Sequence, residues 1–313
     1  MSVHVYYLRF RAPVTELPRA PALWGHLAWA ERWHAGEAKL KEFLNAFATD
    51  PPFLISSAFP VATAKQNRKL LLPRPKLPPI LEKDSRKRKA LKRIQYLTCE
   101  LFKRVAELGE KELVEAYESE SYHLEGNALV PSGYQVGWTS ESRVRVGIDR
   151  STGAHASGIL FADTAKRLTE AVVYVDFRLK DYGPSWFEER LREVGRVGFG
   201  GKKSVGYGVF ELEAGGEERL PQITGANAYT LLSPALPLSA EGWYAIEPYW
   251  GRLGEHYALA ANPFKRIYYR AVEGSTFRER PAGAFLDVTP EPPPEEGVRV
   301  YEYLHPFVLG VRV

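Results

Sequence analysis

The sequence predicts an α+β protein of two domains, the first of them a βαββαβ unit that carries a long insertion. The length supports two domains, because 313 residues exceed the usual size of one domain, roughly 100–200 residues. The order of candidate elements supports the unit: a strand and a helix precede a long interruption, which is followed by a strand, a hairpin, a strand, a helix and a strand. The expected domains span residues 1–213 and 214–313.

The chain is expected to begin with a strand over residues 3–10, where side chains alternate and Val and Tyr are frequent. A helix should begin at Pro21, since apolar residues recur after it at helical spacing and proline is favoured at the first helical position. Gly36 should separate it from a shorter helix over residues 37–47. No Ser, Thr, Asp or Asn stands just before Pro21, so the first N–H groups of the helix are predicted to be open to water or an anion.

The expected insertion spans about residues 50–130. Several prolines in its first part favour an extended path, because proline interrupts a regular helix. From Ser85 to Leu108, apolar residues recur at three- and four-residue steps, which predicts one amphipathic helix. Six basic residues stand in its first turns: Arg86, Lys87, Arg88, Lys89, Lys92 and Arg93. Cations at this end oppose the helix dipole, so we expect a role for them other than helix stability.

An alternating pattern over about residues 143–161 predicts a β-hairpin, with a tip of small and polar residues from Ser151 to Gly158. A strand over residues 171–179, a helix over residues 186–194 and a glycine-rich turn leading into another strand complete the first domain. The stretch from Ala214 to Gln222 is expected to be the linker. Beyond it, the sequence predicts five strands and no strong helix: 228–232, 242–248, 264–272, 298–303 and 308–313.

Charge is distributed unevenly along the chain. The total is +4, from 42 Lys and Arg against 38 Asp and Glu, but the segment from Lys65 to Arg104 carries 14 basic and three acidic residues. Its net charge is therefore +11, and the rest of the chain sums to −7. Such asymmetry is typical of proteins with a polyanionic partner, although a run of like charge is more often a solvated face.

Little in the sequence indicates catalysis or metal binding. Cys99 is the single cysteine, so the chain can form neither an internal disulfide nor a thiolate zinc site, and a reducing, cytoplasmic location is expected. The histidines form no HExxH motif, so neither a metal nor a cofactor is expected. His26 and His155 could serve as general acid or base, but their spacing gives neither a catalytic partner. No stretch approaches 18 apolar, uncharged residues, so no membrane contact is expected.

The segment from Gly198 to Gly208 contains five glycines together with Lys202, Lys203 and two aromatic residues. Glycine lets a ligand approach the backbone amides closely, and the lysines add positive charge. The segment matches neither a Walker loop nor a dinucleotide-binding motif, since Arg196 and Lys203 stand where those motifs need glycine. Single-strand binders combine basic grooves with aromatic rings, so contact with RNA or phosphate is favoured over a tight connection alone.

This segment, GFGGKKSVGYGVF, resembles the C-terminal glycine-rich loop of the RAMP proteins of CRISPR systems, whose unit is a ferredoxin-like, RRM-type domain. Three further segments resemble, in order, the fourth Csm subunit of type III-A effector complexes: PPFLISSAFP followed by LLPRPKLP, then RKRKALKRIQYL, then RVRVGIDRSTGAHASGILF. The likeness covers most of residues 1–212, and the last third matches mainly in HPFVLGVRV. The resemblance implies two RAMP domains, the second of them degenerate, and no catalytic activity.

The resemblance also implies a function in antiviral defence. The subunit of this family holds the 5′ handle of the CRISPR RNA and links the guide-bound backbone RAMP subunit to the large Cas10-type subunit. The hairpin would act as a thumb that wedges between bases of the guide–target duplex, which brings target RNA close to it. The residues implied to bind RNA lie in the glycine-rich segment, the hairpin and the start of the first helix: Gly200, Gly201, Lys202, Lys203, Ser204, Arg143, Arg145, Arg150, His155, Arg19, Trp24 and His26.

Two other functions stay open on the sequence. The first is a metal-independent endoribonuclease that processes CRISPR RNA on the same RAMP scaffold, with His26 or His34 as general acid or base. The glycine-rich segment fits that enzyme equally well, whereas the long insertion and the hairpin do not. In the second, the basic segment from Lys65 to Arg104 binds an acidic protein surface.

Overall fold

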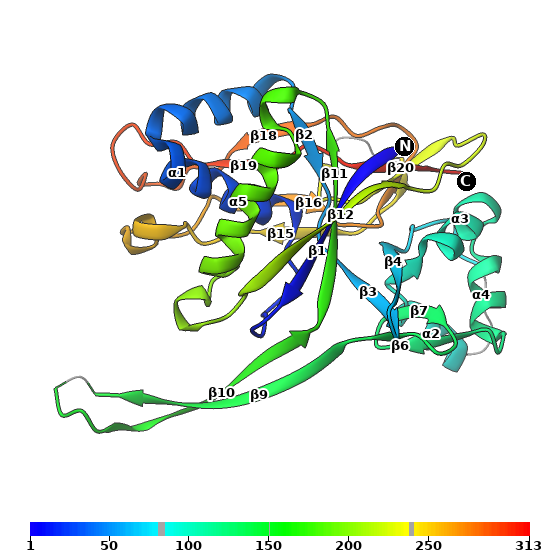
Figure 1. Cartoon of the computed structure of the whole chain (residues 1–313), viewed down its shortest axis with the longest axis horizontal. Coiled ribbons are helices and arrows are strands. Elements are labelled where there is room, and N and C mark those ends of the chain that lie inside the picture. The colour runs from blue at the N-terminus through cyan, green and yellow to red at the C-terminus, as the bar shows by residue number, and fades with distance from the viewer. Residues whose placement is uncertain (81–84, 150, 238–240) are drawn as a thin grey trace.

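The fold is organised around one large mixed sheet (Figure 1). The computed structural model describes residues 1–80, 85–149, 151–237 and 241–313, and within them this sheet has ten strands. Five strands come from residues 1–64 and 170–219: β1 (Ser2–Phe10), β2 (Phe53–Ile55), β3 (Phe59–Ala64), β11 (Glu170–Phe177) and β12 (Phe210–Arg219). Five come from the stretch between: β4 (Asn67–Pro73), β5 (Tyr96–Thr98), β6 (Tyr122–Glu125), β7 (Ala128–Pro131) and β8 (Gln135–Val136). The spatial order is β12-β1-β11-β3-β4-β5-β7-β6, with β2 paired to β11 and β8 to β3.

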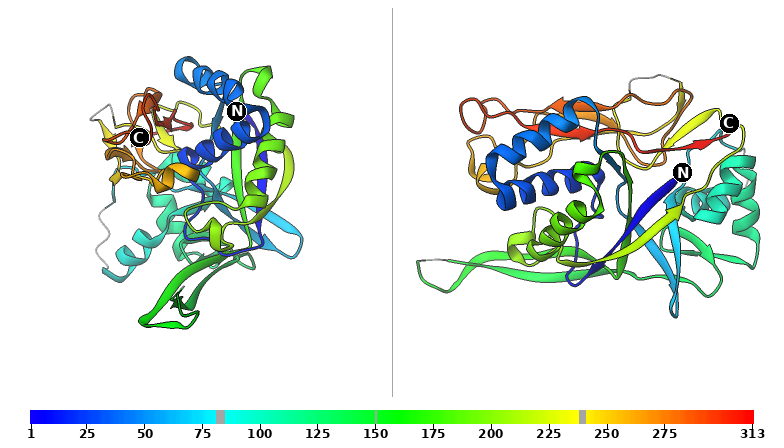
Figure 2. Two further views of the ribbon diagram at one scale, coloured as in Figure 1. Left: turned by 90° about the vertical axis from the view of Figure 1, so that its left-hand side faces the viewer. Right: turned by 45° about the horizontal axis from the view of Figure 1, so that its top comes forward.

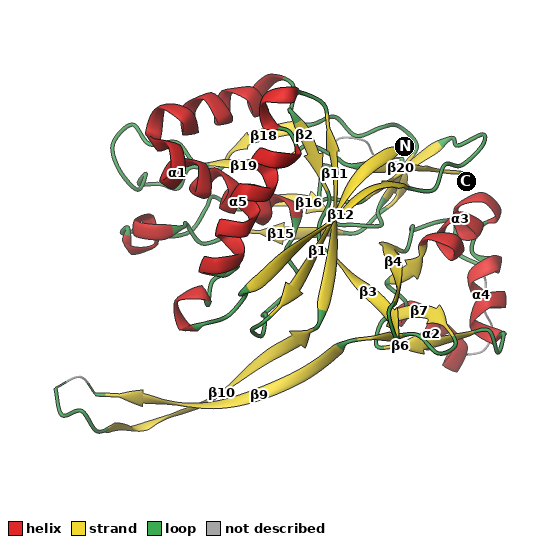
Figure 3. Ribbon diagram, in the orientation of Figure 1, coloured by secondary structure: helices red, strands yellow, loops and turns green. Residues whose placement is uncertain are grey.

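The α-helices form two groups beside this sheet (Figure 3). One group is α1 (Ala20–Thr49) and α5 (Pro184–Val197), and the other is α2 (Ser85–Arg93), α3 (Cys99–Leu108) and α4 (Lys111–Glu118). In chain order, β1, α1, β2 with β3, β11, α5 and β12 give a βαββαβ order, but β2 and β3 lie within the expected insertion of residues 50–130, so the second strand comes before the interruption and not after it. The α+β class is confirmed.

The first helix follows its prediction except at its first amide. Gly36 interrupts α1 with a φ of 84°, at the point where two helices were expected to meet. Arg19 is the N-cap and no side chain caps the helix, as the sequence indicated. However, the N–H of Ala20 donates to Ser57 Oγ at 3.0 Å. The prediction of open N–H groups is therefore wrong for this amide, because a loop 37 residues away supplies the acceptor.

Both faces of the sheet are buried around the middle of β1, and the alternation along that strand shows how. Tyr6 and Leu8 pack in one hydrophobic cluster with apolar residues of α1 and α5. Val5 and Tyr7 pack in a second cluster on the opposite face, with residues of α3, α4 and the C-terminal strands, among them Phe307. Side chains along a strand alternate between faces, so one strand contributes to two cores.

The predicted single helix over residues 85–108 is wrong. The chain leaves the helix after Arg93, forms β5 between β4 and β7, and starts α3 at Cys99. Thr98 caps α3, since its Oγ1 accepts the N–H of Leu101 at 3.3 Å. The apolar residues stay in the core on both sides of the break, which is why the helical spacing continues through a short strand.

The predicted hairpin is confirmed and is longer than expected. Strands β9 (Trp138–Ile148) and β10 (His155–Leu168) pair antiparallel from Leu168 opposite Trp138 to His155 opposite Ile148. Figures 1 and 2 show that the hairpin projects away from the sheet and the helices. Its strands reach further toward the body than residues 143–161, and near the base Lys166 of β10 pairs with Val14, in the loop after β1.

The C-terminal third consists of short strands. Its four-stranded sheet has the order β14 (Gly242–Trp243), β17 (Thr276–Phe277), β13 (Ala228–Leu231), β20 (Val308–Val311). Two ribbons accompany it, β15 (Ile246–Tyr249) with β16 (Tyr268–Ala271) and β18 (Ala284–Asp287) with β19 (Tyr301–Leu304). The expected strand over residues 242–248 is thus two strands, and β17 and β18 were not predicted.

The expected linker is largely strand, because β12 pairs with β1 as far as Arg219. Among the described residues after Arg219 there is no α-helix, and one 3₁₀ turn, η3 (Glu255–Leu259), occurs. A second ferredoxin-like unit would need two helices, so that detail is not supported, and the division at residue 213 stays a prediction. In the described part of the chain, no helix is long and apolar enough to cross a membrane.

The C-terminal strands pack directly on the N-terminal helix and sheet. Tyr303 and Phe285 contact Trp24 of α1, with ring centroids 5.9 and 5.3 Å apart. The hydroxyl of Tyr303 also accepts the N–H of Ile55 in β2 at 3.3 Å. The core of the first 219 residues is therefore completed by residues near the end of the chain.

Candidate nucleic-acid interface

The segment from Gly198 to Gly208, called the glycine loop from here on, connects α5 to β12 and is closed by backbone hydrogen bonds. The N–H of Phe199 donates to the carbonyl of Gly208 at 3.0 Å, and the N–H of Gly208 donates to Pro13 at 2.9 Å. Gly208 has a φ of 71°, and a Cβ at this position would lie 2.1 Å from the carbonyl oxygen of Phe199. Only glycine allows the two ends of the loop to approach so closely.

The two aromatic residues of the glycine loop are buried, so their rings are not open to bases as the rings of single-strand binders are. Phe199 is 7% exposed and Tyr207 1%. Their rings instead support the loop from below. The Tyr207 ring lies 5.7 Å from Lys202 Nζ and 5.6 Å from the guanidinium carbon of Arg143, near the base of the hairpin. This contact brings two predicted RNA-binding residues from different elements to one place.

Most amides of the glycine loop donate to acceptors within the protein, so few of them are open to the ligand that the glycines were expected to admit. The N–H of Lys203 donates to Gly200 at 3.3 Å, and that of Gly206 donates to Lys203 at 3.0 Å, within the 3₁₀ turn η2 (Lys203–Val205). Gly201 and Ser204 lie at the exposed tip. Among the described residues we find no acceptor for their N–H groups. An anion would therefore meet two amides and the lysines rather than a continuous nest.

His26 on α1 supports the glycine loop as a neutral hydrogen-bond acceptor. Its Nε2 accepts the N–H of Gly200 at 3.4 Å, and its ring lies 4.9 Å from that of Phe199. Burial, together with the positive charges of Lys203 and Lys265, lowers the pKa of His26 to about 3. At neutral pH the imidazole carries no proton to donate from Nε2, which fits an acceptor and does not fit a general acid.

Acidification should therefore destabilise the wild-type protein more than a His26→Gln variant. Because the pKa of His26 falls from 6.5 to about 3 on folding, protonation favours the unfolded chain. The contribution of neutral His26 to the free energy of unfolding is complete above pH 6.5. It is lost as the pH falls toward 3, at up to about 1.4 kcal/mol per pH unit.

Urea unfolding at pH 6.5 and pH 4 measures this difference, and we expect about 2–3 kcal/mol of extra loss in the wild type. Burial also lowers the pKa of His305, but that residue is present in both proteins and cancels. Parallel stability profiles for the two proteins would contradict the assignment.

Lys203 has a partner that the sequence did not reveal. Its ammonium pairs with the carboxylate of Glu255 at the start of η3, and it lies 5.5 Å from the ring of Trp33. Trp33 is 45% exposed at the surface of α1. No motif or spacing connects these residues to the glycine loop, since 52 residues separate Lys203 from Glu255. Glu255 and Trp33 are therefore additions to the predicted site.

Arg19 and Trp24 have structural partners instead of open surfaces. Arg19 pairs with Glu247 and lies 3.7 Å from the carboxylate of Glu273. The carboxylate of Glu247 also accepts from Arg270 at 2.8 Å. Trp24 is 3% exposed within an aromatic cluster. Burial excludes Trp24 from direct RNA contact in this structure, and the charge of Arg19 is used to join α1 to the C-terminal strands.

The hairpin presents an apolar face that nothing in the described chain covers. Val144, Val146 and Ile148 alternate along β9 and are 70%, 49% and 65% exposed. Arg145 lies in the same strand and His155 begins β10, whereas Arg150 lies outside the described residues. Exposed aliphatic residues at this density mark a surface that contacts a ligand or a partner.

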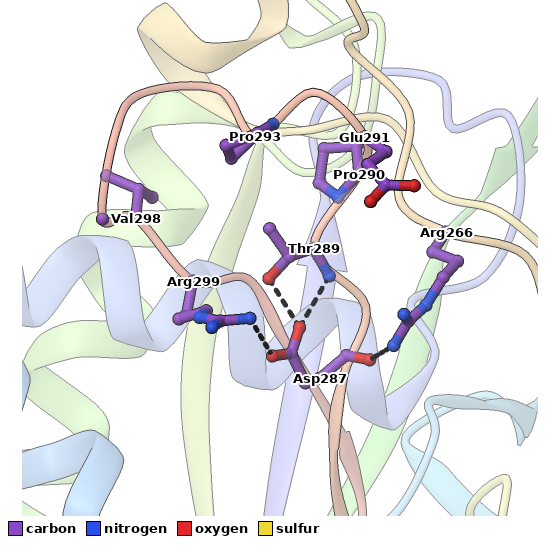
Figure 4. Close-up of a pocket in the computed structure, with 9 residues that line it drawn as sticks. Arg266, Asp287, Thr289, Pro290, Glu291, Pro293, Val298 and Arg299 are labelled. Carbon is purple, nitrogen blue, oxygen red and sulfur yellow. Dashed lines mark hydrogen bonds and ion pairs between the residues drawn. The ribbon is translucent and has the colours of Figure 1, made fainter.

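A separate cavity of about 290 Å³ lies beside the acidic, proline-rich loop after β18 (Figure 4). Asp287 holds its polar groups together: it accepts from the N–H of Thr289 at 2.9 Å, pairs with Arg299 at 3.2 Å, and its carbonyl accepts from Arg266 at 2.6 Å. These contacts link four of the residues that line the cavity: Arg266, Asp287, Thr289 and Arg299. Among the described residues, no group of three His, Cys, Asp or Glu side chains is placed to hold a metal ion.

Comparison with known proteins gives matches at the level of structure. No family model matches the sequence, and no curated protein matches it. A chain of the Csm1–Csm4 cassette in complex with cA4 matches with a TM-score of 0.65 and 19% identity, over 100% of this chain and 99% of that chain. A chain of the Csm3–Csm4 subcomplex in the type III-A CRISPR-Cas interference complex matches with a TM-score of 0.60 and 15% identity, over 99% of this chain and 100% of that one. The subunit common to both assemblies is Csm4, and the chain has this fold over its whole length.

Proposed function

We propose that the chain is a non-catalytic subunit of a type III-A CRISPR effector complex, active in antiviral defence in the cytoplasm. In this proposal it holds the 5′ handle of the CRISPR RNA and links the guide-bound backbone subunit to the large Cas10-type subunit. The full-length fold match carries the proposal, because it joins this chain to one subunit found in assemblies with Csm1 and with Csm3. Those assemblies supply the partners proposed here.

The chemistry of the interface supports an RNA ligand. A single-stranded handle offers phosphates, which suit Lys202 and the exposed amides of Gly201 and Ser204. The apolar face of β9 suits contact with bases of a guide–target duplex. Arg143 has the opposite parity in this strand and lies beside Tyr207 of the glycine loop, so the proposal places handle and duplex next to each other at the base of the hairpin.

Replacing both Lys202 and Lys203 by alanine is expected to weaken the binding of handle RNA. The plot of log binding constant against log salt should become less steep by about 0.7 for each phosphate that the variant no longer neutralises. Titration of labelled handle RNA at several salt concentrations measures both effects. Unchanged affinity and an unchanged salt slope would remove the glycine loop from the interface.

Glu255→Gln is the matched variant for this experiment. It removes the carboxylate that pairs with Lys203 and leaves the lysine in place. Binding should be retained or strengthened, because a phosphate no longer competes with Glu255 for the ammonium group. A loss of binding in this variant would show that the ion pair shapes the loop and that Lys203 does not contact RNA.

The endoribonuclease alternative is weakened for His26, because its Nε2 already accepts the N–H of Gly200 at 3.4 Å. His34 lies at the surface with Nδ1 3.2 Å from Glu193 of α5. Incubating the protein with a repeat-containing RNA should give no site-specific cleavage. Cleavage that His26→Ala abolishes would instead support the enzyme.

A further inference from the structure

We infer that the exposed face of α2 is a second nucleic-acid contact, which takes the phosphate backbone of a single strand. This contact extends the proposed function to a surface that the glycine loop does not reach. It also gives a role to the basic helix that the sequence singled out and that handle binding leaves unused.

The face is almost purely cationic. In the nine residues of α2, six are basic and none is acidic. Leu91 and Ile94 are buried and hold the helix against the body. Four cations on the outer side are exposed and, within the described residues, have no ion-pair partner: Arg88, Lys89, Lys92 and Arg93. Repulsion among them costs stability that nothing on this face recovers.

Outside α2, five cations of the basic segment behave differently, because each pairs with a carboxylate. The pairs include Arg68 with Glu213 at 2.7 Å, Lys69 with Glu100, Arg74 with Glu110 at 2.6 Å, Lys103 with Glu107 at 3.9 Å and Arg104 with Glu112 at 2.6 Å. The excess of +11 calculated for residues 65–104 is therefore not spread over a broad surface. It is concentrated on α2.

The position of α2 separates it from the glycine loop. The glycine loop leads into β12 at one edge of the large sheet, whereas α2 immediately precedes β5, near the other edge. Figures 1 and 2 agree in placing α2 with α3 and α4, on the other side of the molecule from α5. A ligand at α2 is thus either a distant part of the same strand or a different strand.

Two features favour a nucleic-acid backbone over an acidic protein. Residues one helical turn apart, such as Arg88 and Lys92, have Cβ atoms about 5–6 Å apart, an interval similar to that between successive phosphates. The exposed side of α2 also carries no large apolar residue. Protein interfaces are depleted in lysine and depend on aromatic or aliphatic anchors, whereas contacts with phosphate need neither.

The test uses the full chain and a variant in which Arg88, Lys89, Lys92 and Arg93 are all replaced by alanine. Arg86 and Lys87 stay, so the pair between Lys87 and Glu118 is kept. The probes are a labelled 20-mer of uridine and a labelled 20-mer of thymidine, titrated over a range of salt. We expect at least about tenfold weaker binding near 0.1 M salt and a salt slope lower by about 2–3, since each phosphate left without a cation lowers the slope by about 0.7.

A variant with Arg88→Lys and Arg93→Lys keeps the charge and should bind as the wild type does. A larger loss on the uridine probe would assign the site to RNA, and a larger loss on the thymidine probe would assign it to a DNA strand. Unchanged affinity and slope on both probes overturns the inference. So does an alanine variant that releases a partner subunit from a coexpressed complex while it still binds both probes normally.

The glycine-loop variant, with Lys202→Ala and Lys203→Ala, is measured in parallel on the same probes and on handle RNA. If the glycine-loop variant loses handle binding while the α2 variant binds normally, the proposed function stands and the inferred contact at α2 is wrong. Loss in the α2 variant alone supports the contact at α2 and counts against the glycine loop. An unchanged thermal unfolding midpoint in the α2 variant shows that exposed charge, and not the fold, was altered.

Discussion

Arg190→Ala is expected to lower the free energy of unfolding by about 3–5 kcal/mol. Arg190 of α5 and Glu31 of α1 form an ion pair with Nε and Oε2 2.6 Å apart, and their side chains are 5% and 6% exposed. Trp186 donates to the same carboxylate oxygen at 3.0 Å. Without the guanidinium, the carboxylate of Glu31 is a buried charge with one neutral donor. An unpaired buried charge is strongly destabilising.

Urea unfolding measures this loss, with two matched variants beside it. Arg192→Ala removes a cation from the same helix, but its pair with Glu188 is partly exposed, so the cost should stay within about 1 kcal/mol. Replacing both Glu31 and Arg190 by methionine removes both buried charges and should recover much of the loss. If Arg190→Ala costs no more than Arg192→Ala, the pair does not hold the two helices together.

Gly208→Ala is expected to open the glycine loop and reduce the binding of handle RNA by at least about tenfold. A left-handed φ costs a non-glycine residue about 1–3 kcal/mol. The new Cβ would also lie 2.1 Å from the carbonyl oxygen and 2.5 Å from the nitrogen of Phe199. Both atoms belong to the backbone, so no side chain can rotate away, and the hydrogen bond between Phe199 and Gly208 must break.

Alanine variants of two other glycines in the loop distinguish the cost of a left-handed φ from the cost of the close backbone contact. Gly206 has a φ of 82° and open space around a Cβ, so Gly206→Ala should cost only the strain, about 1–2 kcal/mol. Gly201 has open space and no left-handed φ, so Gly201→Ala should be close to neutral for stability. Unfolding and RNA titration of the three variants give the comparison. If Gly208→Ala lowers stability and RNA binding no more than Gly206→Ala does, the close approach of residue 208 to the Phe199 backbone is not important.

Local sequence patterns predicted the fold well where a single strand or helix accounts for the whole periodic pattern. The alternation over residues 3–10 and the kink at Gly36 are both found. The error at residues 85–108 has a physical cause: β5 is three residues long, and helical spacing of apolar residues continues across it. What ends the helix is pairing with β4 and β7, which lies outside the window that a periodicity can sample.

The residues of the glycine loop could be predicted from the sequence, but the residues that contact the loop could not. The glycine loop and its lysines stand together in the sequence, so their chemistry could be recognised. The acceptor for Gly200 is His26, 174 residues earlier, and the carboxylate beside Lys203 comes from a 3₁₀ turn in the last third. Arg68 likewise pairs with Glu213, 145 residues away, so a local charge count overstated the cationic surface.

The packing of Tyr303 and Phe285 on Trp24 sets the earliest moment at which the aromatic core can close during synthesis. Roughly 80 residues follow β12 before Tyr303 is made, and at about 5–20 residues per second their translation takes roughly 4–16 s. For that interval the nascent chain carries α1 with one side of Trp24 open to water. A chain that ends before residue 303 keeps this surface permanently and is a substrate for chaperones or proteases from the time it leaves the ribosome.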